Sequence, residues 1–218
     1  MIDFNKLIDN YLVREYKAKP IGRYYPSEVG GCLRKTWFSY KFPKETDVAL
    51  MRIFEAGNML HEFITDVIKS EKNKEVDLID SEMPIKIERD GFIISGRIDN
   101  LVLLKVDGKQ VLVEVKSTKY LPKEHKLENE MQLQLYMHAT KVHTGIILYI
   151  QKDNLQTNWF DIDYNEKEVE NILDRFEILH KSLVMDKMPW QEAKTDPDKR
   201  WMCDYCAYGK ECDLEEHE

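Results

Sequence analysis

The chain has 218 residues, of which 43% are hydrophobic and 33% charged, and its formal net charge is −8. This length allows one compact domain with a substantial core, and no stretch approaches the roughly 20 apolar residues that a membrane span requires. The negative charge argues against a protein that holds nucleic acid through a general positive field, although residues 1–50 carry nine Lys or Arg against six Asp or Glu. Because the N-terminal sequence lacks the pattern of a secretory signal, we expect a cytoplasmic protein without disulfides.

The hydrophobic pattern predicts a helical first third, then an antiparallel meander, then alternating helices and strands. Helical spacing is found in three early segments, Ile2–Lys17, Ser27–Tyr40 and Val48–Ile68. Short apolar runs fill Glu75–Lys116 and are separated by turn signals at Arg89-Asp90-Gly91 and Asp107-Gly108. Later segments predict two helices, Leu127–Lys141 and Glu166–Met185, and two strands, Gly145–Gln151 and Asn158–Tyr164. An irregular region is expected around Pro189 and Pro197, and the predicted fold is α/β.

The hairpin at Asp107-Gly108 is expected to place two acids and a lysine on one face of the sheet. With a two-residue turn, Asp99 lies opposite Lys116, and Leu101 lies opposite Glu114. Side chains alternate along a strand, so Asp99, Glu114 and Lys116 share a face, and both carboxylates are within reach of one metal ion. Mg²⁺ or Mn²⁺ prefers such oxygen ligands and can activate water against a phosphodiester, with Lys116 orienting that water or offsetting charge. A solvated cluster of surface ion pairs would give the same pattern.

Three sets of residues resemble the PD-(D/E)XK nucleases, and specifically their RecB-like branch. They are Gly96-Arg97-Ile98-Asp99 followed by Val113-Glu114-Val115-Lys116, His61 on an earlier helix, and Gln132 with Tyr136 in a Gln-x-x-x-Tyr motif. The resemblance implies a PD-(D/E)XK restriction-endonuclease-like mixed sheet flanked by helices. It also implies a catalytic set consisting of Asp99, Glu114, Lys116, Gln132 and Tyr136, and a Mg²⁺ or Mn²⁺ site formed by His61, Asp99, Glu114 and the backbone carbonyl of Val115.

The four cysteines lie at two ends of the chain. Cys32 is early, whereas Cys203, Cys206 and Cys212 form a late C-x2-C-x5-C pattern. Three cysteines around a C-x2-C pair indicate a metal site in a cytosolic chain, and zinc and a four-iron cluster both accept four thiolates. The spacing does not choose between these metals, and a set of unrelated buried thiols is a third interpretation.

The segment Pro26–Lys35 around Cys32, together with the late cysteine triplet, resembles the iron-sulfur RecB-like nucleases, and most closely the stand-alone CRISPR-associated Cas-four family. This resemblance extends over nearly the whole chain. It implies a [4Fe–4S] cluster on Cys32, Cys203, Cys206 and Cys212, with zinc as the alternative. It also implies one nuclease domain over residues 1–218, in which an N-terminal helical part of about 1–70 and a C-terminal tail of about 189–218 are joined by the cluster.

The same resemblance implies a metal-dependent DNA exonuclease that acts on single-stranded ends and processes prespacers beside the CRISPR integrase proteins in antiviral defence. Phosphate contacts are expected from Arg34, Lys35 and Arg97. Tyr24, Tyr25, Trp37 and Tyr40 are candidates for stacking on bases, although core packing fits each of them better. Two alternatives stay open: a non-catalytic DNA-binding or adaptor protein of the same fold, and a viral or mobile-element nuclease unrelated to CRISPR. No membrane partner is expected.

Overall fold

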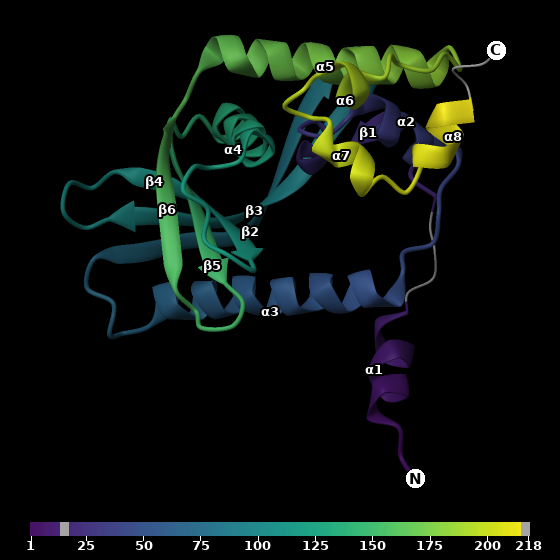
Figure 1. Ribbon diagram of the computed structural model, residues 1–218. Helices are drawn as coiled ribbons and strands as arrows, with labels where there is room; N and C mark the ends of the chain where they lie inside the picture. Colours follow the sequence, from purple (N-terminus) through teal and green to yellow (C-terminus); the bar gives the residue numbers. More distant parts are fainter. Residues whose placement is uncertain (14–17, 215–218) are drawn as a thin grey trace.

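The computed structural model describes residues 1–13 and 18–214, and Figure 1 shows a β-sheet between two layers of helices. The strands are β1 (Arg23–Tyr24), β2 (Val76–Arg89), β3 (Phe92–Leu104), β4 (Gln110–Thr118), β5 (Thr144–Gln151) and β6 (Thr157–Asp163). Their order is β1-β3-β4-β5-β6, and β2 pairs with β3. The β1–β3 and β4–β5 pairs are parallel and the others antiparallel. The predicted α/β class and mixed sheet are confirmed.

Five longer α-helices are present in the described residues. They are α1 (Phe4–Leu12), α2 (Leu33–Lys41), α3 (Val48–Lys69), α4 (Leu127–Thr140) and α5 (Glu166–Val184). In Figure 1, α3 covers one face, whereas α4 and α5 cover the other. A one-turn 3₁₀ helix, η1 (Pro26–Glu28), precedes α2, and three short helices form the C-terminal tail: α6 (Glu192–Thr195), α7 (Trp201–Asp204) and α8 (Gly209–Leu214). None of these described helices is both long and apolar enough to cross a membrane.

Two of the predicted helices differ from the structure. The helix expected over Ile2–Lys17 is found as Phe4–Leu12, and residues 14–17 lie outside the described residues. The single helix expected over Ser27–Tyr40 is wrong, because η1 ends at Glu28 and α2 begins only at Leu33. The reason lies at Gly30, where an added Cβ would lie only 2.5 Å from the Cα of Glu128. The backbone of this loop packs directly against α4.

Side chains of β4 reach apolar layers on both faces of the sheet. Val111, Val113 and Val115 pack with Ile64 of α3 in one cluster. Leu112 belongs to the larger cluster on the other face, which includes residues of α2, α4 and α5. The alternation along the strand therefore directs Glu114 toward α4, opposite to the three valines.

The pairing of β3 with β4 differs from the predicted register by two residues. Leu101 pairs with Leu112 and not with Glu114, and Asn100 pairs with Val113. The predicted pairing of Asp99 with Lys116 is wrong for the same reason. The turn at Asp107-Gly108 is longer than two residues, since the Leu104 N–H donates to the carbonyl of Lys109 (2.8 Å) across a four-residue loop. A shift of two equals the side-chain period of a strand, so each residue keeps its predicted face.

The strands β4 and β5 are parallel, and α4 is the connection between them. Gly145 at the start of β5 allows α4 to lie close to the sheet, because an added Cβ would be 2.8 Å from a methyl carbon of Leu133. This crossover places the buried side of α4, which carries Gln132 and Tyr136, over the face of β4 that carries Glu114.

Candidate active site

Four elements bring the predicted catalytic residues together. His61 comes from α3 and Asp99 from β3, whereas Glu114 and Lys116 come from β4. Gln132 and Tyr136 come from α4. Side-chain contacts join these residues in two groups, His61 with Asp99, and Gln132 with Glu114, Lys116 and Tyr136. Asp99 also accepts the backbone N–H of Val115, the residue between Glu114 and Lys116. The hairpin, the earlier histidine and the Gln-x-x-x-Tyr motif therefore contribute to one site.

Asp99 lies just beyond the last backbone pair between β3 and β4, which joins Asn100 to Val113. One carboxylate oxygen, Oδ2, accepts the backbone N–H of Val115 at 2.7 Å. The other, Oδ1, is 3.3 Å from Nδ1 of His61. Burial alone lowers the pKa of His61, but the hydrogen bond and charge of Asp99 outweigh it and raise that pKa above its usual value. The Asp99 side chain thus ties α3 to the end of β4.

Glu114 is a buried carboxylate with one oxygen unpartnered. The residue is only 2% exposed. Its Oε1 accepts hydrogen bonds from Nζ of Lys116 (2.7 Å) and from Nε2 of Gln132 (2.8 Å). Within the described residues, Oε2 is buried and has no hydrogen-bond partner. Burial raises the pKa of Glu114, opposed by Lys116 and reinforced by the charge of Asp99. Leaving a buried carboxylate oxygen unpartnered is costly, so this atom is suited to receive a cation.

Gln132 connects the lysine to the rest of the site. Its Oε1 accepts from Nζ of Lys116 at 2.9 Å, and its Nε2 donates to Glu114 and to the Tyr136 hydroxyl, each at 2.8 Å. Burial by itself lowers the pKa of Lys116, but Glu114 outweighs burial and raises it, so the ammonium is retained. Gln132 and Tyr136 therefore fix the position of a charged lysine next to a carboxylate.

The donor groups near Lys116 are the carboxylates of Asp99 and Glu114 and the imidazole of His61, and their chemistry suits a divalent ion. The unpartnered Oε2 of Glu114 is the structural observation that supports this fit. In the described part of the chain, no three His, Cys, Asp or Glu side chains are arranged to hold a metal ion as they stand. The fit therefore depends on which donors are present and on the unpartnered oxygen, and a bound ion would require adjustment of these side chains.

A second site of interest is a cavity of about 100 Å³ whose lining includes all four cysteines. Its walls include Phe38, Ala193 and Tyr208, and the four cysteines are free thiols. Burial raises the pKa of the Cys203 thiol, and the charges of the other three cysteines raise it further. Residues from both ends of the chain thus share one cavity, as the sequence predicted, although the described cysteines do not form a ready-made metal site.

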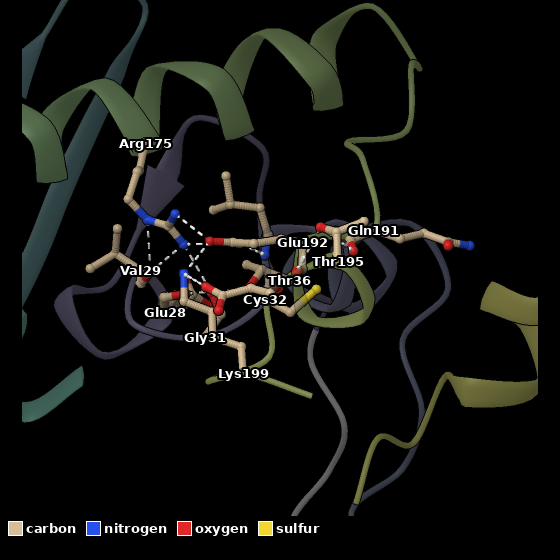
Figure 2. Close-up of polar contacts among 12 residues, drawn as sticks. Glu28, Val29, Gly31, Cys32, Thr36, Arg175, Gln191, Glu192, Thr195 and Lys199 are labelled. Atoms are coloured by element: carbon tan, nitrogen blue, oxygen red, sulfur yellow. Dashed lines mark hydrogen bonds and ion pairs between the residues drawn. The ribbon is translucent and has the colours of Figure 1, made fainter. Parts of the chain in front are cut away.

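Sequence reasoning missed a buried charged group beside this cavity. Glu192 is 5% exposed and is held by Arg175 of α5, as Figure 2 shows. The two residues are 17 apart and lie on different elements, so no local pattern relates them.

The three basic residues predicted to contact phosphates do not form one patch. Arg34 of α2 donates from Nε to the carbonyl of Pro189 (2.6 Å) and, like Lys35, lines the cysteine cavity. Arg97 is on β3, mostly exposed, with Nε 3.2 Å from Glu82. Their role in DNA binding stays a prediction. Tyr24, Trp37 and Tyr40 belong to the main core, which confirms the packing interpretation for these three.

Comparisons with known proteins identify the family and the fold of this chain. Residues 15–213 match the sequence model of the PD-(D/E)XK nuclease superfamily. The CRISPR-associated exonuclease Cas4 of Saccharolobus solfataricus is 25% identical over 195 residues, which cover 86% of each chain. The crystal structure of SSO0001 has the same fold, with a TM-score of 0.64 and 20% identity over 94% of both chains. An alkaline exonuclease from Laribacter hongkongensis is more distant, with a TM-score of 0.48 and 17% identity over 76% of this chain and 90% of that one. The expectation of a nuclease is confirmed, and the chain belongs to the PD-(D/E)XK nuclease superfamily.

Proposed function

We propose that this nuclease is a Mg²⁺- or Mn²⁺-dependent exonuclease that degrades single-stranded DNA from its ends. The observation that carries the proposal is the buried, unpartnered Oε2 of Glu114 next to Asp99 and Lys116. The similarity of this chain to a protein named as a CRISPR-associated exonuclease supports cleavage from the ends of the strand.

Each side chain has a role that follows from its contacts. His61, Asp99, Glu114 and the carbonyl of Val115 would hold the ion. The chemistry supplied by a divalent ion at this position is polarisation of the phosphodiester and activation of a water nucleophile. Lys116 offers a retained positive charge where negative charge develops on the phosphate, and Gln132 and Tyr136 keep it oriented.

Cleavage of end-labelled single-stranded and double-stranded DNA, each with Mg²⁺, Mn²⁺ or EDTA, tests this proposal. We expect stepwise shortening of the single strand with either ion and no cleavage in EDTA. Cleavage that persists in EDTA would overturn the metal requirement. A circular single strand is the matched control, because an exonuclease leaves a substrate without ends intact.

We propose further that Cys32, Cys203, Cys206 and Cys212 ligate a [4Fe–4S] cluster that joins the N-terminal helical part of the chain to the tail. The support is the shared cavity and the four-thiol donor set. Zinc suits the same donors. Metal and sulfide analysis of anaerobically purified protein separates the two, since zinc without iron or sulfide would refute the cluster.

The biological setting that we propose is CRISPR adaptation, in which this nuclease trims prespacer ends beside the integrase proteins. Similarity to Cas4 over most of the chain supports this setting. Trimming assays with purified integrase from the same genome are the test. Trimming to a defined length only when integrase is present supports the proposal, and a length that integrase does not change favours a nuclease with no part in adaptation.

A further inference from the structure

An ion pair between the partly buried Arg175 and the buried Glu192 joins α5 to the tail next to the cysteine cavity. Nη1 of Arg175 is 2.6 Å from Oε1 of Glu192, and Nη2 is 3.1 Å from Oε2, so the contact is bidentate. Figure 2 shows the guanidinium and the carboxylate facing each other between α5 and the loop before α2. Lys199 adds a second cation, with Nζ 2.5 Å from Oε1.

This pair holds the backbone on both sides of Cys32. Nη2 of Arg175 donates to the carbonyls of Val29 and Gly31, each at 3.0 Å. Oε2 of Glu192 accepts the N–H of Leu33 at 3.3 Å. Cys32 is the N-cap of α2, and its side chain makes no capping hydrogen bond. The backbone around Cys32 is therefore fixed by α5 and the tail, while its thiol is left available to the cavity.

Residues of the tail that adjoin or contact Glu192 also contact Cys212 and residues beside Cys203 and Cys212. Nε2 of Gln191 donates to the carbonyl of Cys212 at 3.1 Å, and Lys194 lies 2.5 Å from Asp213. Lys199 contacts Glu192 through its side chain. The backbone carbonyl of Lys199 accepts the N–H of Met202 at 2.9 Å, and Met202 directly precedes Cys203. The segment around Glu192 thus contacts the neighbours of Cys32, Cys203 and Cys212.

We propose that Arg175 and Glu192 form a metal-independent clamp that positions Cys32 opposite the three tail cysteines. The proposal rests on the proposed function for the identity of the ligand, a thiolate-bound iron-sulfur cluster or zinc. Burying the charge of Glu192 is unfavourable unless hydrogen bonds compensate for it, and both Arg175 and Glu192 direct hydrogen bonds to the backbone of the Cys32 loop. The metal-free chain then keeps its cysteine cavity assembled, and cluster loss leaves a site that can be refilled without refolding.

The test uses the full chain stripped of transition metals and a short bis-maleimide crosslinker. Mass spectrometry of the digested protein follows the rate at which Cys32 becomes joined to a tail cysteine. The variants are Arg175→Met, which removes the charge and all donors, and Glu192→Gln, which keeps the volume and an acceptor for Leu33. Glu177→Gln is the matched control, because Glu177 forms an exposed ion pair with Lys181 on the same helix.

We expect rapid crosslinking in the wild type and in Glu177→Gln, at least about tenfold slower crosslinking in Arg175→Met, and an intermediate rate in Glu192→Gln. Circular dichroism identifies a variant that fails to fold. If Arg175→Met does not fold, the crosslinking rate of Glu192→Gln tests the clamp. Wild-type rates in a folded Arg175→Met or in Glu192→Gln would overturn the clamp. Iron and zinc content of the reconstituted wild type separates the two proposals, since fast crosslinking without metal uptake refutes the cluster and leaves the clamp standing.

Discussion

The carboxylate of Asp99 accepts the backbone N–H of Val115 across 2.7 Å, just beyond the point where the β3–β4 backbone pairing ends. The Asp99 side chain thus supplies a hydrogen bond to β4 where the backbone pairing of the two strands has ended. One oxygen of Asp99 is committed to fixing the strand, and the other faces His61. The same contact holds the peptide of Val115, whose carbonyl is a proposed metal ligand, in a defined position relative to Asp99.

Because the two oxygens of Asp99 make different contacts, we expect Asp99→Asn to lower the cleavage rate with little change in the free energy of unfolding. The amide keeps an acceptor for Val115, so the free energy of unfolding should stay within about 1 kcal/mol of wild type. Cleavage should fall at least about 100-fold, because even residues that only support a metal site contribute 10- to 100-fold. Urea unfolding and cleavage of end-labelled DNA measure the two effects. Asp77→Asn removes a surface partner of Lys105 and serves as the control. Full activity in Asp99→Asn would mean that the protein does not use this carboxylate in catalysis.

Gln132→Ala should leave Lys116 held by Glu114 alone and therefore less firmly positioned. The substitution removes the acceptor of Lys116 and the donor to Glu114 and Tyr136. We expect cleavage to fall by roughly 10- to 100-fold. Stability should fall by about 1–3 kcal/mol, since polar atoms are left buried without partners. Steady-state cleavage rates and urea unfolding are the measurements, with exposed Gln110 at the start of β4 changed to Ala as the control. An unchanged rate in Gln132→Ala contradicts a role in orienting the lysine.

The two adjacent glycines before Cys32 should respond very differently to alanine. A Cβ on Gly30 would be 2.2 Å from the Cβ and 2.5 Å from the Cα of Glu128, whereas one on Gly31 would meet nothing within 4 Å. Since the backbone of α4 cannot move aside cheaply, Gly30→Ala should cost at least about 2 kcal/mol. Thermal unfolding should show a midpoint lower by roughly 4–8 °C. Gly31→Ala is the matched control and should unfold near the wild-type temperature, so equal midpoints for the two variants would show that the loop does not pack closely on α4.

Acid should weaken the contribution of Glu192 to stability. Burial raises the pKa of this carboxyl, but Arg175 and Lys199 outweigh burial and lower it below its usual value. A carboxyl with a lowered pKa in the folded state stabilises the protein above its unfolded pKa of about 4.3 and ceases to do so as the pH falls through the folded pKa. The difference in unfolding free energy between wild type and Glu192→Gln should therefore be largest at pH 6 and shrink toward pH 3. Urea unfolding at four pH values measures it, and a difference that stays constant would show that the charge of Glu192 contributes nothing.

The sequence predicted that Asp99, Glu114 and Lys116 lie together, even though it did not predict the strand register. The pattern of apolar residues located β3 and β4, but Asp107-Gly108 suited both a two-residue and a longer turn, and only packing selects the four-residue loop. The error of two residues preserved the faces, so Asp99, Glu114 and Lys116 remained together. Gln132 and Tyr136 were identified by a motif, and their position over Glu114 depends on the close approach of α4 at Gly145, which no local pattern reveals.

Features that depend on contacts between distant segments were not predicted. Strand β1 is two residues long and forms only by pairing with β3, so it has no periodic signal of its own. The tail was expected to be irregular around Pro189 and Pro197, whereas it contains α6 at Glu192–Thr195. The local sequence around Arg175 and around Glu192 is typical of surface residues. The burial of Glu192 and its pairing with Arg175 follow from the packing of the tail against α5 and the loop before α2.

The shared cavity of Cys32 and Cys203 has a consequence for the unfolded chain. Any bond made across it closes a loop of about 170 residues, which is most of the polypeptide. In the chain-entropy treatment of crosslinks, closing a loop of that length disfavours the unfolded state by about 5 kcal/mol at 25 °C. A ligand that stayed bound to these thiols would therefore disfavour the unfolded ensemble, and its loss would make denaturation easier without altering a contact in the nuclease centre.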